Sequence, residues 1–264
     1  MAKLLAIAAA LAVPALTMPA VPMTGAVGTP GQSPPAGELQ VVGGTRAKPG
    51  QFPSIITLDL LDFRHCAAVL LNAKTAVTAG HCVRPGAENL RVRAGTNVWC
   101  EGGIKTNVSA VITHPDIHLP DNDIAVIHLT NALPKSSAIG YANLPPQGSD
   151  PAPKTKVTVA GWGETKWEGN VSRHLLYATV AVTERPACKK LFAEKNVTIT
   201  DSMVCASARG KDSCNGDSGG PLYDAAGTLV GIVSFGVECA DKYGGVYTRV
   251  GKFVDWIKEN SLPA

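Results

Sequence analysis

Residues Gly210–Leu222 read GKDSCNGDSGGPL, and the interpretation of the whole chain depends on this stretch. Its thirteen residues include four glycines, two aspartates and two serines. It is too rich in glycine for a helix interior and too polar for a central strand. It is therefore either a solvated surface loop or a segment whose backbone takes part in chemistry.

Short apolar runs bounded by turn residues lie before this stretch and around it, and each predicts a β-strand. The first group lies at 54–61, 67–72, 75–80, 90–95, 109–114 and 124–129. A proline-rich connector at 143–154 follows, and a second group lies at 156–163, 175–183, 229–236 and 245–250. Two strand groups of this kind predict an all-β fold of two barrels or sandwiches. Phe253, Val254 and Ile257 recur at helical spacing, so we expect a C-terminal helix, with Trp256 in a packing role.

Composition places the chain among globular proteins. It has 264 residues, of which 45% are hydrophobic and 17% are charged. A chain of this length and hydrophobic fraction can bury a sizeable core. The net charge of +3 is too small to indicate a nucleic-acid partner.

The first forty residues have the composition of processed segments. Residues 1–20 combine Lys3, an apolar run and small residues, which predicts a secretory signal peptide cut after Ala15, Ala20 or Ala26. No second apolar run is long enough to predict a membrane span. Residues 21–40 are rich in Pro, Gly, Ser and Thr and predict a propeptide. We therefore expect a secreted, extracellular protein.

Secretion changes the interpretation of the cysteines and of three asparagines. In an oxidising compartment most of the seven cysteines should form disulfides, and an odd number leaves at least one unpaired within the chain. Spacing alone does not give the pairing. Asn107, Asn170 and Asn196 begin N-x-S/T triplets, so the chain is expected to be a glycoprotein, although any one triplet can remain unused.

Three segments carry the residues that nucleophilic catalysis by serine requires. Such catalysis needs a base for the hydroxyl proton, an acid that orients the base, and donors that meet the oxyanion. The glycine-flanked Ser218 lies in GDSGGPL, His81 in TAVTAGHC and Asp123 in DNDIAVIHL. The chain order is His, Asp, Ser, as in the chymotrypsin arrangement.

Together, TAGHC, DNDIAVIHL and GDSGGPL resemble the trypsin-like serine peptidases of the chymotrypsin family, from Val41 to the C-terminus. The resemblance implies a peptidase domain at 41–264, with halves at about 41–145 and 146–264. Each half would be a six-stranded antiparallel β-barrel, with the active site between the barrels. Ser218 would be the nucleophile, His81 the general base and Asp123 the residue that orients His81.

The resemblance also implies roles for residues around the nucleophile. The N–H groups of Gly216 and Ser218 would form the oxyanion hole. Asp212, six residues before Ser218, would lie at the base of the pocket and select Arg or Lys, because a buried carboxylate needs a cationic partner. The remaining substrate-binding residues would be the hydroxyl of Ser213, the pocket walls Gly236 and Gly245, and the strand-pairing segment Ser234, Phe235 and Gly236.

Activation has a sequence signature as well. Val41-Val-Gly-Gly44 resembles the mature N-terminus of the family, and its new α-amino group would pair with Asp217. Gln40 precedes the cut, so an enzyme specific for Arg or Lys should not mature itself, and another peptidase is expected as a partner.

Six cysteines match three family disulfides, which are Cys66–Cys82, Cys188–Cys205 and Cys214–Cys239. Cys100 is left over and is either free or bridges two molecules. No calcium loop is evident, since the segment around Cys100 has Glu101 as its one acid, so we expect neither a metal nor a cofactor.

Several positions depart from the family pattern without removing a catalytic atom. Gly80 replaces an alanine, Phe235 replaces a tryptophan, and Ala67 and Ala68 stand near the catalytic centre, where extra methyl groups could crowd the leaving-group side.

The sequence thus predicts a secreted zymogen of a serine endopeptidase, closest in look to fungal and bacterial trypsins. It would be a monomer acting on proteins or peptides with Arg or Lys at the cleaved bond, and serine-protease inhibitors are a further partner class. No nucleic acid or membrane is expected. The alternative is a catalytically silent relative that binds other molecules, but this chain keeps all three triad residues and Asp212.

Overall fold

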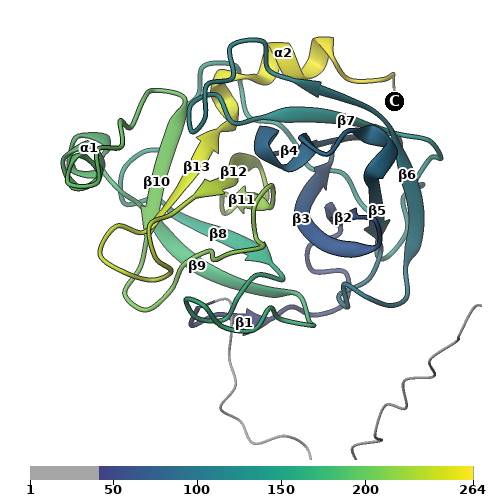
Figure 1. The fold of residues 1–264 in the computed structure, drawn as a ribbon, viewed down its shortest axis with the longest axis horizontal. Helices are drawn as coiled ribbons and strands as arrows, with labels where there is room; N and C mark the ends of the chain where they lie inside the picture. The colour runs from purple at the N-terminus through teal and green to yellow at the C-terminus, as the bar shows by residue number, and fades with distance from the viewer. Residues whose placement is uncertain (1–41, 264) are drawn as a thin grey trace, which may run out of the picture. The chain divides into compact units, whose positions relative to one another are not determined.

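The computed structural model describes residues 42–263 (Figure 1). The expected signal peptide and propeptide, together with Val41, lie outside the described residues. No helix among residues 42–263 has the length and apolar character that crossing a membrane requires.

Six antiparallel strands close the first barrel, in the order β2-β3-β4-β7-β6-β5. They are β2 (Ile55–Leu60), β3 (Phe63–Leu70), β4 (Thr75–Thr78), β5 (Leu90–Ala94), β6 (Ile104–Thr113) and β7 (Ala125–Leu129). In β2 the side chains alternate, so Ile56 and Leu58 enter the barrel core while Thr57 and Asp59 lie on the opposite face. That alternation places a buried acid on the outer face of the barrel.

The second barrel contains β8 (Lys156–Gly161), β9 (Leu176–Val182), β10 (Met203–Ser207), β11 (Pro221–Tyr223), β12 (Leu229–Phe235) and β13 (Gly245–Arg249). Its strand order is β9-β10-β13-β12-β11-β8, and pairing between β8 and β9 closes it. The short β1 (Thr45–Arg46) adds to β9. Figure 1 shows the two rings of strands, and the chymotrypsin-type fold expected from the resemblance is confirmed.

Helices are few and short. They are α1 (Arg185–Ala193), α2 (Val254–Glu259) and the 3₁₀ turns η1 (Gly80–Val83), η2 (Ala87–Asn89) and η3 (Val250–Lys252). The expected C-terminal helix is α2, which buries Val254 and Ile257. Trp256 packs against the hydrophobic core of the first barrel. Its ring centroid also lies 5.0 Å from that of His114, which agrees with the expected packing role.

Every strand predicted from an apolar run is present. The sequence did not predict β1, β10, β11 or α1. The strand β11 has three residues, too few for a periodic pattern. Two local signals could have identified α1: a proline in its first turn, and the helical spacing of its buried residues Cys188 and Phe192.

Candidate active site

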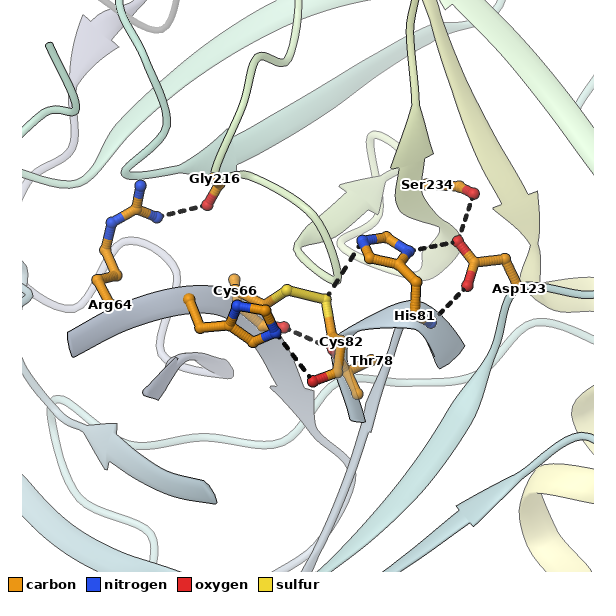
Figure 2. Close-up of a disulfide and its surroundings, with 10 residues drawn as sticks. Arg64, Cys66, Thr78, His81, Cys82, Asp123, Gly216 and Ser234 are labelled. Carbon is orange, nitrogen blue, oxygen red and sulfur yellow. Dashed lines mark hydrogen bonds and ion pairs between the residues drawn. A yellow bond between two sulfur atoms is a disulfide. The ribbon is translucent and has the colours of Figure 1, made fainter. Parts of the chain in front are cut away.

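His81 and Asp123 form a doubly bonded pair in the first barrel. His81 lies in η1, directly after β4, and Asp123 lies two residues before β7, which pairs with β4. The His81 backbone N–H donates to Asp123 Oδ1 at 2.9 Å, and His81 Nδ1 lies 2.8 Å from Asp123 Oδ2 (Figure 2). The Nδ1 contact fixes the orientation of the imidazole and the backbone bond fixes the residue that carries it. Nε2, which lies 3.6 Å from Cys82 Sγ, is the nitrogen left for proton transfer.

The second barrel completes the surroundings of Asp123. Ser234 Oγ donates to Asp123 Oδ2 at 2.6 Å, and Thr248 Oγ1 donates to the Asp123 backbone carbonyl at 2.7 Å. Asp123 is only 2% exposed. A buried carboxylate is stable where donors surround it, so this acid is held by both barrels at their interface.

Ser218 is half-buried in the loop between β10 and β11, and two backbone bonds hold it against both barrels. Ala67 N–H donates to the Ser218 carbonyl at 2.8 Å, and Gly219 N–H donates to the Val233 carbonyl at 2.8 Å. Within residues 42–263 no hydrogen bond joins Ser218 to His81. Catalytic bonds of this kind are often long before substrate binds.

Two backbone N–H groups at and beside Ser218 are free donors. Among the hydrogen bonds of the described residues, none uses the N–H of Gly216 or of Ser218. Gly216 has φ +87°, a conformation that favours glycine. Its loop therefore presents unused donors in the manner that an oxyanion hole requires.

A pocket of about 190 Å³ opens next to Ser218. The predicted residues Ser213, Ser218, Ser234, Phe235 and Gly236 line it. The other lining residues are Trp167, Cys214, Asn215, Val233, Glu238 and Cys239. Trp167 and Glu238 come from loops remote from Ser218 in the sequence, so no motif identifies them, whereas Asn215 lies in the Gly210–Leu222 stretch without a motif of its own.

Asp212 does not line this pocket but adjoins Ser213, which does. Asp212 is 1% exposed, and its carboxylate accepts the N–H of Ser213 at 2.8 Å and of Ala240 at 3.1 Å. A Cβ on Gly245 would lie 2.8 Å from Asp212 Oδ1, so this position needs the close approach that glycine permits. Burial raises the pKa of Asp212 to about 7, against the lowering effect of the two N–H donors.

Asp217 is fully buried and is held by backbone donors. Gly163 N–H donates to its Oδ1 at 2.6 Å, and Cys214 N–H donates to its Oδ2 at 2.9 Å. Burial raises the pKa of this carboxyl as well. Val42 forms an isolated antiparallel bridge with Asp212, so the described chain begins beside this loop.

Three disulfides join the pairs that the resemblance implies: Cys66–Cys82, Cys188–Cys205 and Cys214–Cys239. The first adjoins His81, and the last ties the nucleophile loop to the opposite side of the pocket. Cys100 is exposed and unpaired within the described chain. Cys66, Cys82 and His81 form the one compact group of metal-ligand types among the described residues, but its sulfurs are bonded to each other and cannot act as thiolates.

The departures from the family pattern have local explanations. An alanine at Gly80 would place its Cβ 2.3 Å from Ile117 Cδ1, so the smaller residue makes room for this isoleucine. Ala67 and Ala68 are both 0% exposed, so the concern that their methyl groups crowd the substrate is wrong. Phe235 packs edge-on against Phe192, with ring centroids 5.8 Å apart.

Comparisons with known proteins agree with this geometry. A family model described as Trypsin matches residues 41–257. A protein named Trypsin from Phaedon cochleariae is 37% identical over 232 residues, covering 84% of this chain and 89% of its own length. Trypsin beta from Drosophila erecta is 36% identical over 84% of this chain and 88% of its own length. Trypsin Blo t 3 from Blomia tropicalis is 36% identical over 86% and 88%. The expected likeness to fungal and bacterial enzymes stays a prediction.

Proposed function

This chain belongs to the trypsin family and is a trypsin-like serine endopeptidase that cleaves peptide bonds in proteins; we propose that it cleaves after Arg or Lys, with Ser218, His81 and Asp123 as its triad. The observation that carries the proposal is the buried Asp123. Its carboxylate accepts hydrogen bonds from His81 of one barrel and from Ser234 of the other. Ser218 lines the pocket next to this pair of barrels.

The proposed reaction proceeds through an acyl-enzyme. Ser218 Oγ attacks the carbonyl carbon while His81 Nε2 takes its proton, and Asp123 stabilises the imidazolium that forms. The N–H groups of Gly216 and Ser218 stabilise the oxyanion. His81 then donates the proton to the leaving amine, and water releases the acyl group by the same steps.

Preference for a cationic side chain follows from the charge of Asp212. Its carboxylate has two backbone donors and no cationic partner within hydrogen-bonding distance among the described residues. A substrate guanidinium or ammonium in the pocket would supply the missing charge and lower the pKa of Asp212. Ser213, which adjoins Asp212 and lines the pocket, would add a hydroxyl acceptor.

We further propose that the chain is a secreted zymogen activated by cleavage before Val41. The Val42 bridge to Asp212 supports this, because Val42, which follows the new terminus, lies beside the loop that also contains Asp217. The three disulfides fit an oxidising compartment. Asn107, Asn170 and Asn196 are all exposed, as glycan acceptors must be. Inhibitor proteins and a separate activating peptidase are the partners proposed, and the active form is a monomer.

A fluorogenic peptide assay tests the reaction and its specificity. Protein processed to begin at Val41 should hydrolyse substrates with Arg or Lys before the cleaved bond and should lose activity when a sulfonyl fluoride labels Ser218. Absence of both turnover and labelling would show a silent relative instead. A preference for Phe or Leu would contradict the role of Asp212.

A second experiment tests how the zymogen matures. Proenzyme carrying Ser218→Ala is incubated with a trace of active wild-type enzyme, and the products are sequenced from their N-termini. We expect no cut between Gln40 and Val41, because Gln40 lacks the charge that Asp212 selects. Release of Val41 by the enzyme itself would show that maturation needs no other peptidase.

A further inference from the structure

Arg64 reaches the nucleophile loop from the first barrel. It lies in β3, and Figure 2 shows its guanidinium directed at the backbone carbonyl of Gly216, to which Nη1 donates a hydrogen bond. The guanidinium also lies against the Gly216 α-carbon, since a Cβ there would fall 2.0 Å from Nη2. The side chain of Arg64 and the backbone of Gly216 therefore fit against each other directly.

We propose that Arg64 is a positioning residue for the oxyanion hole. This inference rests on the proposed function, in which the N–H groups of Gly216 and Ser218 stabilise the oxyanion. By holding the Gly216 carbonyl, Arg64 fixes the peptide plane between Gly216 and Asp217, and with it the direction of the two N–H groups on either side.

A buried acid accompanies the arginine. Asp59 is 3% exposed and lies opposite Arg64 in the register of β2 and β3. Burial raises the pKa of Asp59, while the charges of Arg93, Lys105 and Arg64 act in the opposite direction. Burial likewise lowers the pKa of Arg64, against the acids Asp217, Asp59 and Glu164. The cation is thus set among carboxylates behind the loop, where a charge is stable only with such partners.

The loop itself is held at its other points by different groups. Asp217 is fixed by its two N–H donors, and Cys214 by its disulfide to Cys239. Arg64 is the side chain that holds the carbonyl between these anchors. Without it, that carbonyl would be left part-buried with no partner. This favours rotation of the peptide plane towards water, against the remaining bond of the same plane, which runs from the Asp217 N–H to the Cys214 carbonyl at 2.9 Å. Rotation would also turn the two adjoining peptide units, which carry the N–H groups of Gly216 and Ser218, away from the geometry that the oxyanion requires.

The test compares Arg64→Met with a matched control, Arg93→Met. Arg93 carries a second cation near Asp59, but it donates to the Gly102 carbonyl and not to the nucleophile loop. We expect Arg64→Met to lower kcat about tenfold to a hundredfold with little change in KM, because one charge-assisted hydrogen bond is lost. Arg93→Met should keep the wild-type kcat.

Two inhibitors separate positioning from general damage. A peptidyl argininal forms a hemiacetal whose oxygen occupies the oxyanion hole, whereas benzamidine fills the cation pocket alone. In Arg64→Met the aldehyde should bind more weakly by the same factor as kcat falls, while benzamidine affinity stays unchanged. Arg64→Lys keeps the charge, so it should show a smaller loss of kcat and of aldehyde affinity, again with unchanged benzamidine affinity. If the methionine variant does not fold, the lysine variant tests the positioning role.

The outcomes distinguish this inference from the proposed function. A wild-type enzyme without turnover contradicts the proposed function before any variant is compared. With an active wild type, unchanged kcat and aldehyde affinity in the folded Arg64 variants would overturn the positioning role. An equal loss of benzamidine affinity would also overturn it, because the defect would then extend to the whole loop.

Discussion

Asp123 and Asp212 are both almost completely buried, yet their surroundings differ in kind. Asp123, at the interface of the two barrels, accepts the His81 N–H, His81 Nδ1 and the Ser234 hydroxyl. Asp212, beside the pocket, accepts two backbone N–H groups, from Ser213 and Ala240. One acid has the base of the reaction as its partner, whereas the other has no cation of its own.

The difference indicates how the same residue type serves two tasks. A carboxylate surrounded by donors from both barrels orients its partner and contributes to the interface. A carboxylate with two backbone donors and no titratable partner keeps a larger desolvation penalty, and a cation from outside would relieve it. In the proposed mechanism, selectivity at the pocket would follow from incomplete compensation of Asp212, and orientation of His81 from fuller compensation of Asp123.

The largest effect is expected at the triad acid. Asp123→Asn should lower kcat about 10⁴-fold with the fold intact, because the amide cannot hold the His81 tautomer that accepts the Ser218 proton. Stopped-flow or steady-state assays on an Arg peptide measure this loss. Asp121→Asn is the control, since Asp121 binds the hydroxyls of Thr200 and Ser202 rather than His81, and it should retain activity. A mild effect of Asp123→Asn would contradict the proposed difference in role between Asp123 and Asp212.

A smaller loss is expected at the pocket acid. Asp212→Ser should lower kcat/KM for Arg substrates about 10²- to 10³-fold relative to substrates with Phe or Leu, because the substrate cation would enter a buried site without a counter-charge. Parallel assays on matched peptides give the ratio. Asp241→Asn removes a nearby charge and keeps the acceptor for the Tyr243 N–H, so it should change the ratio little. An unchanged ratio for Asp212→Ser would place specificity elsewhere in the pocket.

The smallest effect concerns pH. Because the pKa of Asp212 is raised to about 7, the free pocket is increasingly protonated as the pH falls below that value. A cationic ligand needs the carboxylate, so benzamidine affinity should fall about fivefold from pH 7 to pH 6. The free energy of unfolding changes in the opposite direction. Between about pH 4 and pH 7 the folded state keeps the Asp212 proton while the unfolded state has lost it, so this group lowers the free energy of unfolding as the pH rises.

Titration calorimetry from pH 5.5 to 8.5 measures the binding effect. Asp212→Asn serves as the control, with weak binding that does not vary across this range. Wild-type affinity that stays constant below pH 7 would show that the pocket acid is ionised without a ligand, as a fully compensated carboxylate would be.

Much of the fold was accessible from sequence because short apolar runs between turn residues report strands directly. The runs at 54–61 and 124–129 correspond to β2 and β7, and the spacing of Phe253, Val254 and Ile257 corresponds to α2. The three-residue β11 was not predicted because it is too short for a periodic signal. The disulfide-linked α1 was not predicted because its signal is weak, with two buried residues, Cys188 and Phe192, in nine positions. Arg64 was not singled out either, since nothing near it in the chain indicates that β3 faces Gly216 across the molecule.

By itself, the sequence determined the kind of fold and the candidates for chemistry: the strand groups, the odd number of cysteines, and Ser218, His81 and Asp123 in their order. The tertiary structure alone decided which partner each candidate has. Ser234 reaches Asp123 across 111 positions of sequence, and Asp212 remains without a cation although it is as buried as Asp123. The physical reason is that compensation of a buried charge depends on distance and direction in space, which barrel closure sets and local sequence does not record.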